Sequence, residues 1–399
     1  IQVIIKEIDG VQLSSSSSNS RYGKREDCVV VKLEKEAKIS GKFTNNAFQA
    51  APVKIAKKHL KSRKKEELIL IINAGNANAG NGKLGEEDTL ICCRKISKYV
   101  GINYENIIPF STGVIGEYLD TGSCIRAFKS AFDSLGTSNW EKSSKAILTT
   151  DTRPKLVSKE INLGKNVINV TGFAKGSGMI RPDFATLLSF VFTDAKLNQS
   201  VLNKVHSQVL AESFEKITVD GDTSPNDASV LVATGKSSVV IKSDSKEEKV
   251  LTKKLTEIYQ ELAAQIVRDA EGAKKEIEIQ VSKAKTQGMA KTVAFTVAHS
   301  PLVKTALSGS DANWGRILAA VGRVKEISDI SKVSITLNGV SLVRSGSKDP
   351  NYNESLASTA VKAKKIAIKI ILNQGKEKFS VLTSDLSEDY VLINSDYRS

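Results

Sequence analysis

The spacing of apolar residues along the chain predicts a succession of short strands and amphipathic helices. Compact runs of β-branched and other apolar residues indicate strands, and apolar residues recurring three and four positions apart indicate helices with one buried face. Strands are expected at 29–33, 68–72, 107–110, 146–150, 167–170, 230–233, 277–281, 333–337 and 366–371. Helices are expected at 50–60, 88–100, 124–135, 200–216 and 249–268. Because the two kinds of element alternate only in part, we expect a mixed α/β (α+β) fold of layered β-sheets flanked by helices.

Three polar or glycine-rich segments lie between these elements. The serine run at 14–18 indicates a flexible surface loop between two early strands. The stretch 73–80 combines small residues with side-chain amides, which suits a backbone that turns tightly near a ligand. The segment 111–116 follows an expected strand and is predicted to form a turn and a helix start.

The length of 399 residues favours two or three compact units. The first residues carry no long apolar core ahead of a small-residue cleavage site, so no signal peptide is expected. The longest apolar runs, such as 68–72, are far shorter than the roughly 20 residues that a membrane-spanning helix requires. We therefore expect a soluble, cytoplasmic protein without a membrane partner.

The chain is basic, with a formal net charge of +14. Clustered basic residues would indicate a nucleic-acid partner, because they neutralise phosphates. Here the lysines are spread through amphipathic stretches such as 57–67 and 246–254, where neighbouring Glu residues can pair with them. Aromatic residues interleaved with basic ones, which would stack on bases, are missing. No nucleic acid is expected, and a basic nucleic-acid-binding protein stays as the non-enzyme alternative.

Cysteine and histidine usage argues against a metal site. Cys28, Cys92, Cys93 and Cys124 lack CxxC spacing, and the chain has only three histidines. A disulfide scaffold is equally unexpected, and buried, reduced cysteines are the ordinary state in a cytosolic protein. We expect no metal and no organic cofactor.

Familiar ligand and catalytic motifs are absent or incomplete. The glycines at 172–178 do not follow the GxGxxG order of a dinucleotide site. Gly235-Lys236-Ser237 is similar to the end of a P-loop, but Val230 occupies the position of the first glycine. No GxSxG sequence occurs, and the three histidines, His59, His206 and His299, have ordinary sequence settings, so a Ser-His-Asp hydrolase has no evident base.

The most informative stretch is 174–190. Lys175-Gly176-Ser177-Gly178 forms a glycine-rich turn that leads through Pro182 to Ala185-Thr186, and an apolar strand follows. This order resembles the self-cleavage site of the glutamate N-acetyltransferase (ornithine acetyltransferase) family. Further segments that resemble family signatures span nearly the whole chain: 111–116, 148–155, 220–227, 268–273, 311–317 and 390–399.

The resemblance implies a self-cleaving fold of the N-terminal-nucleophile kind. Cleavage between Ala185 and Thr186 would give an α chain, 1–185, with the oxyanion hole and cleavage site, and a β chain, 186–399, with the nucleophile and substrate-binding residues. The two chains are expected to pair into an α2β2 heterotetramer. After cleavage, Thr186 would carry both a hydroxyl nucleophile and a free α-amine, which titrates near about 7.7 to 8.0 and can act as the base.

The same resemblance assigns the other site residues. Thr112 and Gly113 would form the oxyanion hole. Substrate-binding positions would be Thr149, Lys175, Thr186, Glu271, Asn394 and Ser399. Lys175 suits a substrate carboxylate, and Glu271 suits either a substrate amine or the holding of Lys175.

The implied activity is acetyl transfer from N-acetylornithine to glutamate in arginine biosynthesis, by a ping-pong route through an acetyl-threonine ester. A bifunctional version that also takes acetyl from acetyl-CoA, as an amino-acid N-acetyltransferase, stays open. So does an amidohydrolase or aminopeptidase of similar fold, in which water replaces glutamate. Ornithine release with and without glutamate separates transfer from hydrolysis.

Overall fold

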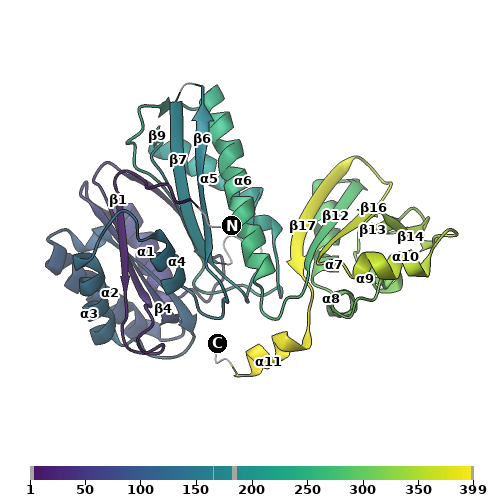
Figure 1. The fold of residues 1–399 in the computed structure, drawn as a ribbon, viewed down its shortest axis with the longest axis horizontal. Helices are drawn as coiled ribbons and strands as arrows, with labels where there is room; N and C mark the ends of the chain where they lie inside the picture. Colours follow the sequence, from purple (N-terminus) through teal and green to yellow (C-terminus); the bar gives the residue numbers. More distant parts are fainter. Residues whose placement is uncertain (1–3, 165, 182–186, 397–399) are drawn as a thin grey trace.

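The computed structural model describes residues 4–164, 166–181 and 187–396. A body built from two packed sheets lies beside a smaller C-terminal unit, and a last helix runs back from that unit towards the body (Figure 1). The expected mixed α/β architecture of layered sheets flanked by helices is confirmed.

The first sheet of the body has the order β1-β2-β4-β5. The pairs β1–β2 and β2–β4 are antiparallel, and β4–β5 is parallel. One face packs against α2 and α3 in a core that contains all four cysteines, each of which is buried. The elements are β1 (Val11–Ser16), β2 (Cys28–Leu33), β4 (Leu68–Asn76), β5 (Ile107–Val114), α1 (Ala51–Ser62), α2 (Gly82–Val100), the 3-10 helix η1 (Tyr104–Asn106), α3 (Thr121–Asp133) and α4 (Trp140–Ala146).

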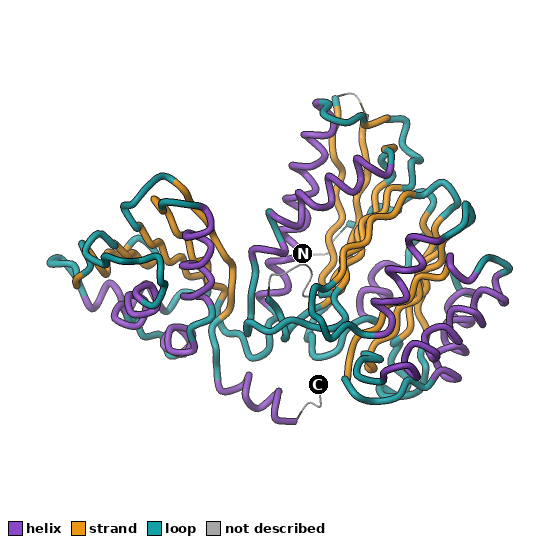
Figure 2. The backbone as a smooth tube through the Cα atoms, turned by 180° about the vertical axis from the view of Figure 1, so that it is seen from behind, coloured by secondary structure: helices purple, strands orange, loops and turns teal. Residues whose placement is uncertain are grey.

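The second sheet has the order β3-β10-β8-β7-β6. Its outer face packs on α5 and α6, while its inner face meets the first sheet in a core rich in Val, Leu, Ile and Phe. Helix, sheet, sheet and helix therefore form four layers (Figure 2). The elements are β3 (Lys38–Phe43), β6 (Lys155–Leu163), β7 (Asn166–Lys175), β8 (Leu188–Thr193), β9 (Lys196–Leu197), α5 (Gln199–Ala211), η2 (Phe214–Lys216), β10 (Ala228–Ala233), β11 (Val240–Ile241) and α6 (Lys246–Arg268).

The C-terminal unit is a six-stranded sheet of order β15-β14-β13-β16-β12-β17, with helices packed against it around a separate apolar core. Its last helix, α11, buries no residue of its own. The elements are β12 (Glu276–Ala284), α7 (Gln287–Ala298), α8 (Pro301–Ser308), α9 (Trp314–Gly322), β13 (Ser334–Leu337), β14 (Val340–Arg344), β15 (Ser347–Lys348), α10 (Glu354–Val361), β16 (Lys365–Ile371), β17 (Glu377–Ser384) and α11 (Glu388–Asp396).

Three local predictions are wrong. The segment 146–150 is not a strand: α4 ends at Ala146, and the apolar residues after it fill the core as irregular backbone. The serine run is not a flexible loop throughout, because residues 14–16 belong to β1, while Ser18, in the connection to β2, is buried and donates a hydrogen bond to the buried Asp27. The expected helix start at 111–116 is also absent, since β5 continues to Val114 and the next helix begins at Thr121.

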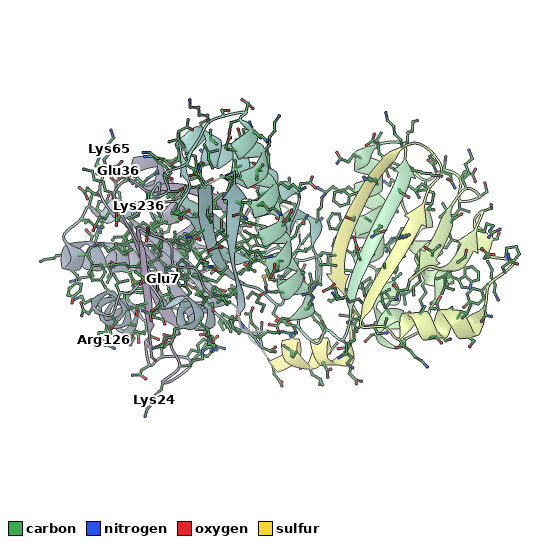
Figure 3. The ribbon with its side chains drawn as sticks, turned by 45° about the horizontal axis from the view of Figure 1, so that its top comes forward. Glu7, Lys24, Glu36, Lys65, Arg126 and Lys236 are labelled. Carbon is green, nitrogen blue, oxygen red and sulfur yellow. The ribbon has the colours of Figure 1, made fainter. Side chains whose placement is uncertain are left out.

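The charged side chains are distributed as the sequence indicated. Lys24, Lys65 and Arg126 are exposed and point outward from separate parts of the body (Figure 3). Lys236 forms an ion pair with Glu34. None of the helices in the described part of the chain is long and apolar enough to cross a membrane.

Candidate active site

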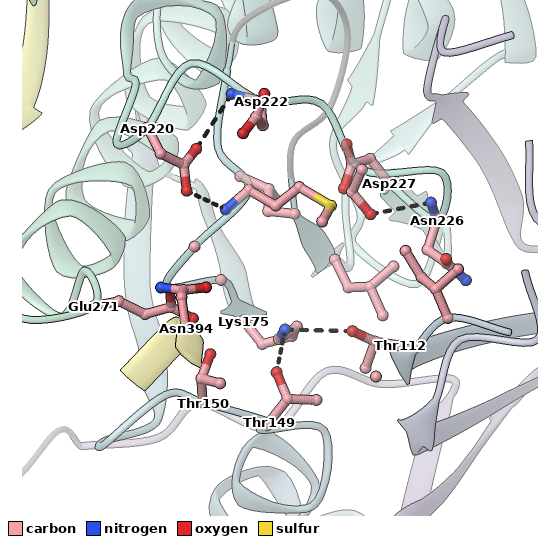
Figure 4. A pocket seen from close by; sticks show the side chains of 18 of the residues that line it. Thr112, Thr149, Thr150, Lys175, Asp220, Asp222, Asn226, Asp227, Glu271 and Asn394 are labelled. Carbon is pink, nitrogen blue, oxygen red and sulfur yellow. Dashed lines mark hydrogen bonds between the residues drawn. The ribbon is translucent and has the colours of Figure 1, made fainter. Parts of the chain in front are cut away.

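A cavity opens where the ends of β5, β7 and β8 meet the loop that precedes β10, and α11 closes its remaining side (Figure 4). This cavity brings together every predicted site residue that the structure describes. These are Thr112, Gly113, Thr149, Lys175, Glu271 and Asn394.

Thr112 and Gly113 lie near the end of β5, beside β4. Gly113 has a φ of +132°, and a Cβ there would lie 2.2 Å from the carbonyl carbon of Gly75. Only glycine fits so close to a neighbouring backbone at this φ. The strand therefore turns its last residues into the cavity at a place where no side chain blocks the backbone.

Lys175, the last residue of β7, lies at the centre of the site. Its Nζ donates hydrogen bonds to Thr149 Oγ1 at 2.7 Å and to Thr112 Oγ1 at 3.3 Å. Asp151 Oδ2 is 3.6 Å from the same nitrogen. The three polar contacts fix a buried ammonium group, which is the chemistry that a carboxylate ligand requires.

Asp151 is the anchor of this wall of the cavity. Its carboxylate accepts hydrogen bonds from the backbone N–H of Gly176 at 2.7 Å and of Thr149 at 3.1 Å, and it forms an ion pair with the fully buried Lys155. Burial raises the pKa of Asp151, but the charges of Lys175 and Lys155 outweigh that effect and hold it well below its usual range. Asp151 is therefore a fixed negative charge.

Glu271 faces the cavity from the opposite side of the glycine-rich turn. Its carboxylate accepts a hydrogen bond from Asn394 Nδ2 of α11 at 2.7 Å. A Cβ on Gly178 would lie 2.5 Å from Glu271 Oε2, so this glycine makes room for the acid. No hydrogen bond or ion pair joins Glu271 to Lys175 among the described residues, which leaves the carboxylate available for a substrate amine.

Asp220 holds the other end of the glycine-rich turn. Its carboxylate accepts hydrogen bonds from the backbone N–H of Met179 at 2.6 Å and of Ile180 at 2.9 Å, and from the Tyr390 hydroxyl at 3.3 Å. Burial raises the pKa of Asp220, while the amide donors act against that rise. The turn is thus tied to the loop at 220–227.

Asp227 also lines the cavity, immediately before β10. It is buried, its Oδ2 has no hydrogen-bond partner, and burial raises its pKa well above the ordinary value. Sequence reasoning assigned no role to Asp151, Asp220 or Asp227. All three nevertheless lie within motifs that carried the family resemblance, 148–155 and 220–227.

The remaining predicted residues, Ala185, Thr186 and Ser399, lie outside the described residues. Leu187, the residue after Thr186 in the chain, is described and lines the cavity together with Leu188.

In this four-layer α/β body, one cavity combines a buried lysine, two threonines that accept its hydrogen bonds, and several carboxyl groups. This combination is typical of an enzyme site for a small polar molecule. The ArgJ family model matches residues 12–399, so the chain belongs to the ArgJ family. The arginine biosynthesis bifunctional protein ArgJ of Methylococcus capsulatus is 42% identical over 98% of this chain and 96% of its own length. The protein of the same name from Psychrobacter arcticus is also 42% identical, over 99% of this chain and 97% of its own length.

A solved structure is similar over about half of the chain. The arginine biosynthesis bifunctional protein of Bacillus halodurans is 34% identical, with a TM-score of 0.49 over 51% of this chain and 96% of that chain.

Proposed function

We propose that this chain is cut between Ala185 and Thr186 and then moves an acetyl group from N-acetylornithine to glutamate through an ester on Thr186. Acetyl transfer in arginine biosynthesis is the activity of the ArgJ family, to which the chain belongs. The observation that carries the proposal is the single cavity that joins Thr112, Gly113, Lys175 and Glu271 to the residue after Thr186.

Thr186 is the proposed nucleophile. Leu187, the residue that follows Thr186 in the sequence, lines the cavity, which supports this assignment. A cut before Thr186 creates an α-amine on the same residue as the hydroxyl, and an unprotonated α-amine can accept the hydroxyl proton. This pairing supplies a base in a cavity that no histidine lines among the described residues.

Thr112 and Gly113 are the proposed oxyanion hole. The open backbone at Gly113 and the Thr112 hydroxyl face the cavity at the end of a rigid strand, as preorganised donors must. Lys175 and Thr149 would bind the substrate carboxylate. Glu271, oriented by Asn394, would bind a substrate amine, and Ser399 completes the proposed substrate-binding positions.

In the first half-reaction, the Thr186 oxygen attacks the acetyl carbonyl of N-acetylornithine, the carbon–nitrogen bond breaks, and ornithine leaves. In the second, the amine of glutamate attacks the acetyl ester and frees the hydroxyl. The curated relatives are called bifunctional, which supports acetyl-CoA as a second acetyl donor.

The proposed α chain, 1–185, and β chain, 186–399, would stay joined after cleavage. In the second sheet, β3, β6 and β7 precede the cut, while β8 and β10 follow it. β8 pairs with β7, and β10 pairs with β3, so the ladders of one sheet hold the two chains. We further propose an α2β2 assembly that works in the cytoplasm.

Substitution of Thr186 tests the mechanism. Thr186→Ala lacks the hydroxyl and should abolish both cleavage and transfer, whereas Thr186→Ser should retain part of each. Electrophoresis with N-terminal sequencing measures cleavage, and ornithine release with and without glutamate measures transfer. An uncut Thr186→Ala protein that transfers acetyl at the wild-type rate would falsify the proposal.

The same assay decides between transfer and hydrolysis. Ornithine release that continues at full rate without glutamate identifies an amidohydrolase. Release that requires glutamate, or that stops after one equivalent per site, identifies a transferase. Replacing N-acetylornithine with acetyl-CoA then tests the second donor.

A further inference from the structure

The proposed reaction sets a proton requirement that the Thr186 amine does not meet. The α-amine returns the hydroxyl proton to the leaving nitrogen, which gives a neutral ornithine amine. The released amine then takes up a further proton to become the ammonium ion that prevails at neutral pH. Glutamate then enters as an ammonium ion and must lose one proton before its nitrogen can attack the ester.

Asp227 lines the cavity, and its carboxyl group has no part in the mechanism proposed above. It is 3% exposed, and one of its oxygens, Oδ2, has no hydrogen-bond partner. The hydrogen bonds that it does accept come from Ser224, on its own loop. Asp227 forms no ion pair among the described residues, although Lys175 lines the same cavity (Figure 4).

The backbone around Asp227 is tied to Leu187 and to Ser111. The N–H of Ala228 donates to the carbonyl of Leu187 at 3.0 Å, which sets Asp227 next to the residue bonded to Thr186. On its other side, Asn226 Nδ2 donates to the carbonyl of Ser111 at 2.9 Å, next to Thr112. Asp227 therefore lies between the start of β8, which follows Thr186 in the sequence, and the end of β5, which carries Thr112.

A carboxylate in this position would be poorly stabilised. A buried charge without an ion partner and with one unpaired oxygen is disfavoured, so burial favours the protonated form of this carboxyl. Burial accordingly raises the pKa of Asp227, and the opposing effects of Ser224 and Lys175 are smaller.

The other titratable groups around the cavity have their own partners. Asp220 accepts backbone hydrogen bonds, Glu271 accepts from Asn394, and Tyr390 donates to Asp220. Asp222 is exposed to solvent on the same loop. Lys175 is the one charged side chain in the described part of the chain that acts appreciably on Asp227.

We propose that Asp227 is the proton carrier of the transfer reaction, a role that rests on the proposed function. In the first half-reaction its COOH group gives a proton to the released ornithine amine and becomes a carboxylate. In the second, that carboxylate takes a proton from the ammonium group of glutamate, which frees the nitrogen to attack the acetyl ester. Each proton is returned within one cycle, so the carboxyl ends in its starting form.

Asp227→Asn tests this assignment, because the amide keeps the size of the carboxyl group but carries no proton between substrates. The first half-reaction should survive, giving a burst of one equivalent of ornithine and an acetylated Thr186 fragment detectable by mass. Turnover with glutamate should fall by about 100-fold at neutral pH. Its rate should then rise close to tenfold per pH unit, since only unprotonated glutamate can react.

Hydroxylamine provides the rescue experiment, because its nitrogen is already unprotonated at neutral pH. The Asp227→Asn protein should transfer acetyl to hydroxylamine within about threefold of the wild-type rate. Asp194→Asn is the matched control, since Asp194 is another largely buried carboxyl with a raised pKa but lies at the far end of β8, outside the cavity. It should leave both transfers unchanged.

Three outcomes overturn the proposal. These are glutamate turnover within threefold of wild type, an equal loss with hydroxylamine, and loss of the ornithine burst in a protein that is cleaved and has an unaltered melting temperature. A misfolded or uncut Asp227→Asn protein is replaced by Asp227→Ser, judged by the same criteria. Failure of the proposed function looks different, because the wild-type enzyme would then show neither ping-pong kinetics nor dependence on Thr186.

Discussion

Two buried aspartates, Asp227 in the lining of the cavity and Asp151 behind Lys175, differ in the partners that surround them. Asp151 is surrounded by two lysines and two backbone N–H donors, whereas Asp227 has hydrogen bonds from one serine and an oxygen with no partner. Both lose the solvation that favours a charge. The pKa of Asp151 is nonetheless held low and that of Asp227 is raised.

The difference teaches that partners, rather than depth, decide the charge of a buried carboxyl. The fixed anion of Asp151 orients Lys175 and so shapes the carboxylate-binding wall. Asp227 has no ion pair among the described residues and its pKa is raised, which favours the protonated form that the proposed proton transfer requires. In the proposed mechanism, Asp151 helps to position the substrate through Lys175, and Asp227 moves the proton.

The largest expected effect comes from breaking the Asp151 wall. Asp151→Asn removes the charge between two buried lysines and should lower the free energy of unfolding by about 3 to 5 kcal/mol. Urea unfolding measures the loss, and acetyl transfer should fall with it because Lys175 loses its carboxylate partner.

Glu141→Gln is the matched control for that experiment. Glu141 forms an exposed ion pair with Lys145, so its loss should cost less than about 1 kcal/mol. If Asp151→Asn proved as mild as Glu141→Gln, the view of Asp151 as the anchor of the wall would fail.

A smaller effect on stability, but a clear one on rate, is expected for Thr112→Ala. Loss of the hydroxyl removes one donor of the proposed oxyanion hole and a partner of Lys175. Turnover should fall by roughly 100- to 1,000-fold. Steady-state kinetics on a cleaved, folded variant measures it, and unchanged turnover would remove Thr112 from the oxyanion hole.

The smallest effect is a difference in the pH dependence of stability. Since the folded pKa of Asp227 is raised, the wild-type protein should lose stability as pH rises above the unfolded value of about 3.9. Asp227→Asn should remove this slope, which is at most about 1.4 kcal/mol per pH unit.

Asp151 should behave in the opposite sense. Its folded pKa is lowered, so its contribution is present above about pH 3.9 and disappears as pH falls further. Chemical unfolding of the wild type and both variants across pH would reveal two opposed slopes. Parallel slopes would contradict the contrast between the two carboxyls.

The sequence predicted much of this molecule where a local pattern determines the outcome. β2, β4, β10, β12 and β16 were expected from short apolar runs, and each forms at or close to the expected positions. The family motifs selected Thr112, Lys175, Glu271 and Asn394, which lie far apart in the chain yet meet in one cavity.

The errors arise where long-range packing overrides local pattern. The apolar residues 146–148 favour a strand by composition. In the structure Ala146 ends α4, and Ala146 and Ile147 pack into the core. Polar Ser14 would be exposed in most strands, yet β1 is covered by α3 and α4. The opposite states of Asp151 and Asp227 depend on lysines and amides that only the tertiary fold brings near, so residue type alone could not reveal them.

The second sheet contains strands from both sides of the proposed cut, which has a consequence for refolding. A precursor of one chain folds in a unimolecular process, with β7 and β8 linked by covalent bonds. Cleavage before Thr186, as proposed, would leave an unfolded state of two separate molecules, so refolding would depend on protein concentration. At the protein concentrations found in a cell, the cleaved enzyme would therefore not refold efficiently after it unfolds. Its lifetime would be set by its unfolding rate.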